Sequence, residues 1–345
     1  MMPVDSFKHS LRIHRNINRR VLHNIARLWQ LGQQAKTHQE LLDGLHPWGE
    51  HPSLKFNNVL PIILMFAAGT CALATFIFIQ QGIFAGLCLL TACALGFAAY
   101  VYHEPQTPLQ EVVSFLRQQV LEKKYQLRSQ ELPAHFPDTM QPFFLLARLK
   151  SLFPVFQQGS VSNMLPVYAS TCWQDQHGQS WPVMLFQYDF IHEVSLPGQS
   201  PAQGNLKRTQ KSLWGIFIFE QPAPFGLAVT TAHKEFDWPY QELWQTSDIQ
   251  INQKLRIYGH DALQLAKIMT PAMALRLNDF FTGRSGDLLW HSEQNILCFL
   301  TEQNLFKMDA NRQDITDISR LRGHLRTFRL SHYEQLEQDL KQLLQ

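Results

Sequence analysis

Two apolar stretches separated by three polar or small residues decide how this chain is organised. They read VLPIILMFAAGTCALATFIFI (residues 59–79) and IFAGLCLLTACALGFAAYVY (residues 83–102), with QQG between them. Residues 56–103 contain no Asp, Glu, Lys or Arg. At a rise of 1.5 Å per residue, a helix of about 20 residues just crosses a hydrocarbon core of about 30 Å. We therefore expect a transmembrane helical hairpin with a tight turn at residues 80–82.

Basic residues flank the hairpin and are absent from its tip. Those before it are Lys8, Arg12, Arg15, Arg19, Arg20, Arg27, Lys36 and Lys55, and those soon after it are Arg117, Lys123, Lys124 and Arg128. Because Lys and Arg near the ends of spans mark the cytoplasmic side, we expect a multi-pass protein with both termini cytoplasmic and the tip outside. A cleavable signal peptide is not expected, because the apolar block begins more than fifty residues into the chain.

The two predicted spans contain small residues at a spacing of four. These are Ala68 and Ala72, Gly82 and Gly86, and Ala92 and Gly96. Such spacing lets helix backbones approach closely. It fits packing of the two spans on each other, and it also fits contact with a second copy of the chain. The absence of charged residues gives no indication of a proton relay or ion pathway.

The segment before the hairpin, residues 1–55, is expected to be cytoplasmic, basic and helical. Apolar residues recur every three or four positions over residues 6–45, and the first half carries Arg12, Arg15, Arg19 and Arg20. These arginines either rest on anionic lipid of the inner leaflet or form a solvated face. Four arginines without interleaved aromatic residues, in a chain of net charge +2, do not indicate nucleic-acid binding. The stretch HPWGEH (residues 46–51) reads as a linker entering the membrane and not as a metal site.

The segment after the hairpin, residues 104–159, is expected to be a cytoplasmic helical stalk. Thr107 and Pro108 begin a helix that we extend to about residue 131. Val112, Leu116 and Val120 form one apolar stripe, which we expect to pack on the folded domain that follows. A second, shorter helix is predicted over about residues 140–152.

Residues 160–345 are predicted to form a cytoplasmic α+β domain with a mostly antiparallel sheet. Alternating apolar residues predict strands at residues 167–173, 181–191, 212–220, 227–231, 255–258, 288–291 and 295–300. Residues 195–211 read as a loop. Helical patterns cover about residues 261–281 and 314–344, and we expect the first of these helices to bend or restart at Thr270–Pro271.

The chain contains none of the common catalytic, phosphate-binding or metal-binding motifs, and no C-x-x-C pair. We therefore predict no cofactor and no metal site, and we assign no catalytic residue. Weak candidates remain in the pairs His192–Glu193, His260–Asp261 and Tyr188–Asp189. A basic group on the last helix, Arg320, Arg322, Arg326 and Arg329, either meets an acidic partner or phospholipid or forms a solvated face.

The C-terminal half carries a pattern that is similar to a known family. Residues 248–258 (DIQINQKLRIY) end a short strand at a Tyr, and residues 267–275 (KIMTPAMAL) place Thr-Pro within a helix. A predicted strand hairpin at residues 288–300 follows, and residues 212–219 (SLWGIFIF) form a strand upstream. Over about residues 57–340 the chain resembles the domain of unknown function 3137 family of bacterial two-span membrane proteins. It departs from the family pattern at residues 160–205.

This resemblance implies a location in the bacterial inner (plasma) membrane, and it brings no catalytic residue with it. We expect a non-enzymatic role, in which the cytoplasmic α+β domain is a binding module for a protein or ligand, or a scaffold. The expected partners are the lipid bilayer and a protein or a second copy of the chain. One alternative is a membrane-anchored hydrolase or transferase with an unrecognised site. The other is a subunit of an oligomeric channel or transporter, which the lack of pore-lining charge disfavours.

Overall fold

The chain forms two compact units, which we describe separately. The computed structural model describes residues 16–49, 51–80, 82–133, 142–159, 161–174, 178–195, 206–220, 226–231, 240, 242–291, 293–309 and 314–344. The first unit contains residues 1–124 and 310–328, and the second contains residues 125–309 and 329–345. Residues 310–328 thus belong to the first unit, although they lie within the sequence range that we expected to form one α+β domain.

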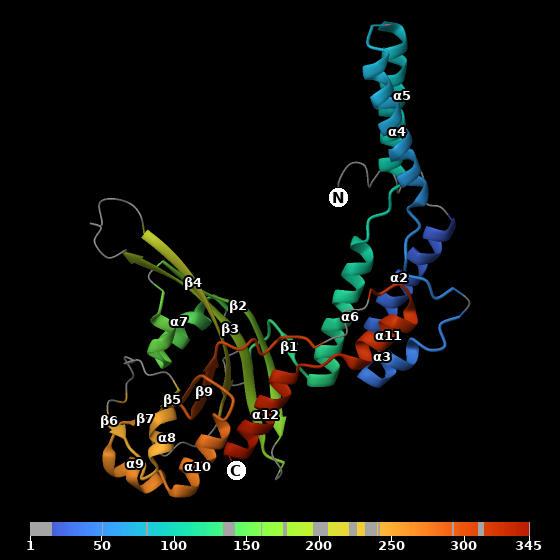
Figure 1. Ribbon diagram of the computed structural model, residues 1–345. Coiled ribbons are helices and arrows are strands. Elements are labelled where there is room, and N and C mark those ends of the chain that lie inside the picture. The colour runs from blue at the N-terminus through green and yellow to red at the C-terminus, as the bar shows by residue number, and fades with distance from the viewer. Residues whose placement is uncertain are drawn as a thin grey trace. The chain divides into compact units, whose positions relative to one another are not determined.

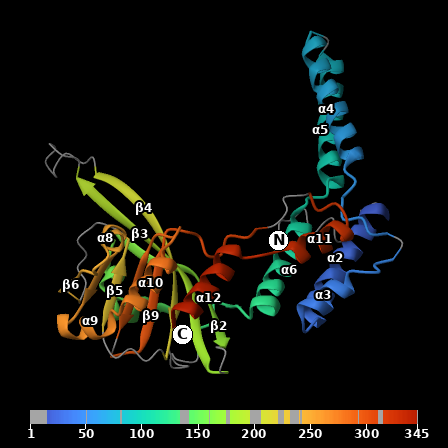
Figure 2. The ribbon, with the colours of Figure 1, turned by 60° about the horizontal axis from the view of Figure 1, so that its bottom comes forward.

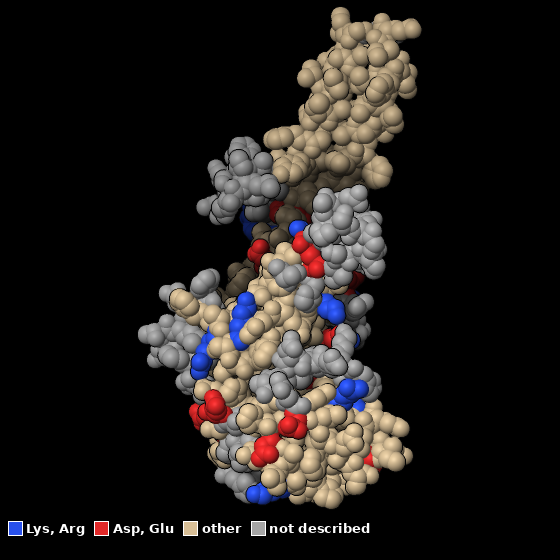
Figure 3. All heavy atoms as spheres, turned by 90° about the vertical axis from the view of Figure 1, so that its left-hand side faces the viewer, with Lys and Arg blue, Asp and Glu red and all other residues tan. Residues whose placement is uncertain are grey.

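Two apolar helices form a hairpin in the first unit (Figure 1): α4 (Val59–Ile77) and α5 (Gly82–Tyr102). Both are long and apolar enough to cross a membrane. Their bounds lie within two residues of the predicted spans. Figure 3 shows no Lys, Arg, Asp or Glu atoms on the visible face of this hairpin. Its large apolar side chains point outward, as the exposed fractions of Phe66 (73%), Phe76 (73%) and Ile83 (82%) show.

Among the described residues of the first unit, four further helices are present: α2 (Asn16–Gln34), α3 (His38–Gly44), α6 (Thr107–Tyr125) and α11 (Ile318–Thr327). The predicted N-terminal helix is therefore divided between α2 and α3. Thr37 begins α3 as its N-cap, because its hydroxyl accepts a hydrogen bond from the Glu40 amide. Residues 6–15 of the predicted helix lie outside the described residues.

The α6 helix packs on α2 and on α11, and of these only α11 lies within residues 160–345, the range on which we expected the apolar stripe to pack. Phe115 stacks on Trp29 of α2 with ring centroids 4.3 Å apart. On the α11 side, Arg117 Nε donates to His324 Nε2 at 3.0 Å. Val112, Leu116 and Val120 are fully buried. The helix ends at Tyr125, six residues earlier than predicted.

The second unit is built on a nine-stranded sheet in which every pair of neighbouring strands is antiparallel. The strand order is β1-β2-β3-β4-β9-β8-β5-β7-β6. The strands are β1 (Arg128–Ser129), β2 (Ser162–Gln174), β3 (Ser180–Ser195), β4 (Leu206–Ile218), β5 (Leu227–Thr230), β6 (Glu242–Trp244), β7 (Arg256–Gly259), β8 (Asp287–His291) and β9 (Ile296–Thr301). The predicted combination of helices with an antiparallel sheet is confirmed.

Helices cover both faces of this sheet. They are α7 (Pro142–Leu152), the 3₁₀ helix η1 (Pro154–Gln157), α8 (Ile249–Lys254), α9 (Ala262–Ile268), α10 (Pro271–Phe280) and α12 (Ser331–Leu344). Phe153 and Phe156 pack on Phe217 from one side. Phe280 packs on Phe299, and since Phe299 pairs with the residue next to Phe217 in β4, it points to the opposite face. Figures 1 and 2 show α10 and α12 close together on this second side.

One predicted element boundary is confirmed, and two predicted elements have different boundaries in the structure. The break at Thr270–Pro271 is confirmed, because α9 ends at Ile268 and Thr270 caps α10 through the Met273 amide. Part of the predicted loop 195–211 is strand, since β4 already begins at Leu206 and pairs with β3. The predicted last helix is interrupted at Phe328, whose backbone is extended.

Candidate functional site

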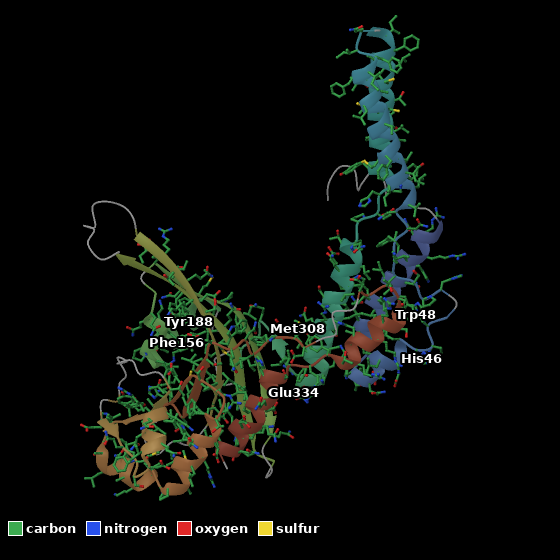
Figure 4. All side chains as sticks on the ribbon, in the orientation of Figure 1. His46, Trp48, Phe156, Tyr188, Met308 and Glu334 are labelled. Carbon is green, nitrogen blue, oxygen red and sulfur yellow. The ribbon has the colours of Figure 1, made fainter. Side chains whose placement is uncertain are left out.

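The segment between α3 and α4, residues 45–58 (hereafter the linker), is held by hydrogen bonds from two other parts of the first unit. Leu54 and Phe56 are buried while Lys55 between them is exposed, which is the alternation of an extended chain. Trp48 is also buried, with 8% of its surface exposed. The linker therefore has a buried side and an exposed side, and Figure 4 labels two of its residues, His46 and Trp48.

Side chains of α2 hold the linker in place. The amide nitrogen of Asn24 donates to the carbonyl oxygens of His51 (2.8 Å) and Ser53 (3.0 Å), and its amide oxygen accepts from Trp48 Nε1 (3.1 Å). Arg27 donates to the Trp48 carbonyl oxygen at 2.8 Å and places its guanidinium 4.0 Å from the centre of the indole ring. Buried polar groups that are satisfied in this way fix one arrangement of the backbone.

The chain leading into α11 holds the linker from the other side. The Leu54 amide donates to the Thr316 carbonyl oxygen, and the Ile318 amide donates to the Pro52 carbonyl oxygen, both at 2.9 Å. These bonds form an antiparallel bridge centred on Ser53 and Asp317. These hydrogen bonds therefore fix the position of the linker relative to the start of α11.

Between the linker and α11 lies a hollow of about 700 Å³, which we call the basic hollow. One wall is the linker, and the other is a single face of α11 made by residues at a spacing of three and four. The residues that matter for its chemistry are His46, Trp48, Ser319, Arg322, Gly323 and Arg326. None of the described residues that line it is an Asp or a Glu.

Two arginines give the basic hollow its charge. Arg322 Nε donates to the Leu42 carbonyl oxygen at 3.0 Å, which fixes the side chain, and its outer guanidinium nitrogens form no ion pair within the part of the chain that the structure describes. Arg326 lies one turn later, is exposed, and forms no ion pair with any described residue. Planar guanidinium groups match phosphate and carboxylate oxygens with paired hydrogen bonds. The basic hollow can therefore bind an anionic group.

The structure separates the four arginines that the sequence placed in one group. Arg322 and Arg326 face the basic hollow, whereas Arg320 lies 3.6 Å from Asp317 and Arg329 pairs with Glu334. The described residues of the HPWGEH stretch, 46–49 and 51, lie between α3 and α4 and belong to no helix or strand. In the described part of the chain no three His, Cys, Asp or Glu side chains are grouped so that they could hold a metal ion.

The predicted lipid-contact arginines are only partly within the described residues. Arg19 and Arg20 are exposed in the first turns of α2, and Arg12 and Arg15 lie outside the described residues. Among the small residues of the hairpin, Ala92 is buried and Ala68 and Ala72 are half-buried. A Cβ atom added at Gly82, Gly86 or Gly96 would have no atom within 4 Å, so these glycines do not mediate close contact between α4 and α5.

Three of the weak candidates in the α+β unit, Tyr188, Glu193 and Asp261, form structural contacts. Tyr188 donates to the Phe156 carbonyl oxygen at 2.8 Å and thereby holds η1 against the sheet (Figure 4). Burial raises the pKa of Tyr188 to about 12, so its hydroxyl stays protonated. Asp261 caps α9 through the Leu263 amide, and Glu193 forms a cross-strand ion pair with Arg208 at 2.7 Å.

One ionisable group of the sheet is absent from the sequence-based candidates. Asp287 of β8 accepts a hydrogen bond from the Thr230 hydroxyl at 2.5 Å, and both residues share a cross-strand row. Burial raises the pKa of Asp287 to about 6, an effect that this hydrogen bond partly offsets. No sequence pattern marks this position, because its hydrogen-bond partner Thr230 is 57 residues away in the chain.

A scan against protein-family models finds no match for this chain, and searches of curated proteins and of solved structures find no match either. The function must therefore be inferred from the geometry of the chain itself.

Proposed function

We propose that the protein is an integral membrane protein anchored by the α4–α5 hairpin. The outward-facing Phe66, Phe76 and Ile83 would be unfavourable in water and favourable in lipid. Basic residues on both flanks favour cytoplasmic termini. The resemblance to the domain of unknown function 3137 family adds the proposal that this membrane is the bacterial inner membrane.

We further propose that the anchored body is a binding module for a small anionic ligand, which the basic hollow receives. The single observation that carries this proposal is that Arg322 and Arg326 line the same wall of the hollow, and that none of the described residues lining it is acidic. A hollow of about 700 Å³ is within the size range of small-molecule sites. The proposal places the ligand in the helical unit, whereas the sequence had suggested the α+β domain.

The ligand class follows from the groups that face the hollow. Two guanidinium groups suit a ligand with phosphate or carboxylate oxygens, and the Ser319 hydroxyl adds a donor and an acceptor. Trp48 contributes an apolar indole ring to the wall. The Arg27 guanidinium lies over this ring, and Asn24 accepts a hydrogen bond from its Nε1. We infer a phosphorylated or polycarboxylated small molecule as the ligand.

Thermal unfolding of the detergent-solubilised full chain tests the proposal. With inorganic pyrophosphate as the probe, the midpoint should rise with probe concentration, because a ligand that binds only the folded state stabilises it. Arg326→Gln and Arg322→Gln/Arg326→Gln should each weaken the apparent affinity, the double variant by at least about tenfold, as expected for lost charged hydrogen bonds.

The matched control is Lys254→Gln/Arg276→Gln, which removes two exposed cations from the α+β unit. It should leave the response to pyrophosphate unchanged. Equal responses from the wild type, both arginine variants and this control would refute binding in the basic hollow.

A further inference from the structure

The beginning of α2 is tied directly to the beginning of the first apolar helix. The Asn57 amide donates to the side-chain oxygen of Asn18 at 2.8 Å, and the Asn18 side-chain nitrogen donates to the Asn57 carbonyl oxygen at 3.4 Å. Asn18 is buried, with 1% of its surface exposed. Since Asn57 is two residues before Val59, the first turn of α2 lies at the base of the hairpin.

A second amide clamp closes the base of the hairpin itself. The Glu104 amide donates to the Asn58 side-chain oxygen at 3.1 Å, and the Asn58 side-chain nitrogen donates to the Glu104 carbonyl oxygen at 2.9 Å. This pair joins the residue before α4 to the chain after α5. The base therefore consists of linker, α2 and hairpin ends held together by side-chain amides.

Two cations converge at this base. Arg20 follows Asn18 by two residues and Lys55 precedes Asn57 by two, and both are exposed. They line one groove of about 450 Å³ together with His51 and Asp317 (the base groove). Asp317 already accepts from the Arg320 amide at 2.8 Å and lies 3.6 Å from the Arg320 side chain. Neither Arg20 nor Lys55 forms an ion pair with a described residue.

We propose that the base groove binds the phosphate of an anionic phospholipid in the leaflet around the hairpin base. The inference rests on the membrane anchoring proposed above. Lys55 is four residues before Val59, which is at most about 14 Å of extended chain, and long cationic side chains reach toward the interface. A guanidinium and an ammonium on one groove favour a headgroup with net negative charge over a zwitterionic one.

Native mass spectrometry of the full chain released from lipid nanodiscs tests this proposal. The nanodiscs contain phosphatidylcholine mixed with phosphatidylglycerol, and the readout is the ratio of the two lipids that stay bound. The wild type should retain phosphatidylglycerol in excess of its share in the nanodisc. Arg20→Gln/Lys55→Gln should lower this excess about tenfold, since each cation near the surface contributes to the attraction.

Two control variants and competition with inorganic phosphate test whether lipid binding depends on the charges of the base groove. Arg20→Lys/Lys55→Arg keeps both charges and should keep the enrichment, and Lys254→Gln/Arg276→Gln should behave as the wild type. Excess inorganic phosphate should not displace the lipid, because a free anion lacks the acyl chains that hold the headgroup at the groove. Displacement by inorganic phosphate would instead assign the groove to a soluble phosphate and overturn the lipid proposal.

The outcomes also separate this inference from the proposed function. A chain that inserts into nanodiscs but retains both lipids in the nanodisc ratio overturns the lipid site alone. A chain that fails to associate with nanodiscs contradicts the membrane anchoring, and the lipid site with it. Equal enrichment in the wild type and in Arg20→Gln/Lys55→Gln, with both proteins melting at the same temperature, overturns the role of the base groove.

Discussion

At the scale of single residues, Asp287 is a carboxyl group whose surroundings raise its pKa to about 6. Its carboxyl group is largely enclosed by the sheet, and the Thr230 hydroxyl supplies one hydrogen bond. An acid that is easier to protonate in the folded state than in the unfolded state weakens the fold once it ionises. The effect of pH on stability follows from the two pKa values.

Asp287→Asn should remove a pH dependence of stability. Between about pH 4 and pH 6 the folded state holds more protons on this carboxyl than the unfolded state, so the free energy of unfolding falls as the pH rises. The asparagine variant should lack this slope and be more stable than the wild type at pH 7 by roughly 2 kcal/mol. Thermal unfolding across this pH range measures it.

The control for this experiment is Asp279→Asn, which changes an exposed carboxyl group on α10. It should keep the slope of the wild type. If Asp287→Asn and Asp279→Asn show the same pH dependence, the carboxyl of Asp287 is not enclosed as described.

At the scale of elements, the contact between α2 and α6 is close enough to require a glycine. A Cβ atom at Gly32 would lie 2.5 Å from Phe115 Cε1 and 3.0 Å from a methyl group of Leu116. The Phe115 ring is stacked on Trp29 and has little freedom to move aside. In contrast, a Cβ atom at Gly323 on the outer face of α11 would have no atom within 4 Å.

Gly32→Ala and Gly323→Ala should therefore change stability in opposite directions. The first should cost about 1–3 kcal/mol through overpacking, which exceeds the gain in helix propensity. The second should gain about 0.5–1 kcal/mol, because alanine favours the helix and meets no obstacle. Chemical unfolding monitored by circular dichroism measures both, and equal effects of the two substitutions would contradict the packing of α2 on α6.

The elements show which features of the fold are readable from sequence. Both apolar helices, most strands and the break at Thr270–Pro271 follow from hydropathy period and from proline chemistry. The contact of α6 with α2 does not follow from the sequence, because the stripe of Val112, Leu116 and Val120 shows only that one side is buried, not against which element. Only the fold reveals that α11, at the far end of the chain, also packs on α6.

The candidate site, too, depends on contacts between distant segments that the sequence does not show. The sequence marks Arg322 and Arg326 as basic residues on a helix and marks residues 46–51 as a linker. It gives no sign that the two meet, because the hydrogen bonds that join them run between backbone groups of Pro52, Leu54, Thr316 and Ile318. Backbone pairing of irregular segments leaves no side-chain pattern to read.

At the scale of the whole molecule, the hairpin predicts how the chain lies across a membrane. Reporter fusions inserted after Gln80 and at the C-terminus should report opposite sides, because the tip carries no basic residue and the flanks carry many. Reporter activity on the same side at both positions would contradict a hairpin that crosses the bilayer twice.

The most direct test of anion binding in the basic hollow is to fill the hollow without removing its charges. Gly323→Phe adds a ring to the face of α11 that lines the hollow, at a position where an added Cβ atom has no neighbour within 4 Å. Isothermal titration of pyrophosphate into this variant should show an affinity at least about tenfold below that of the wild type, with an unchanged or higher unfolding temperature. An affinity equal to that of the wild type would place any anion binding elsewhere and contradict the proposal.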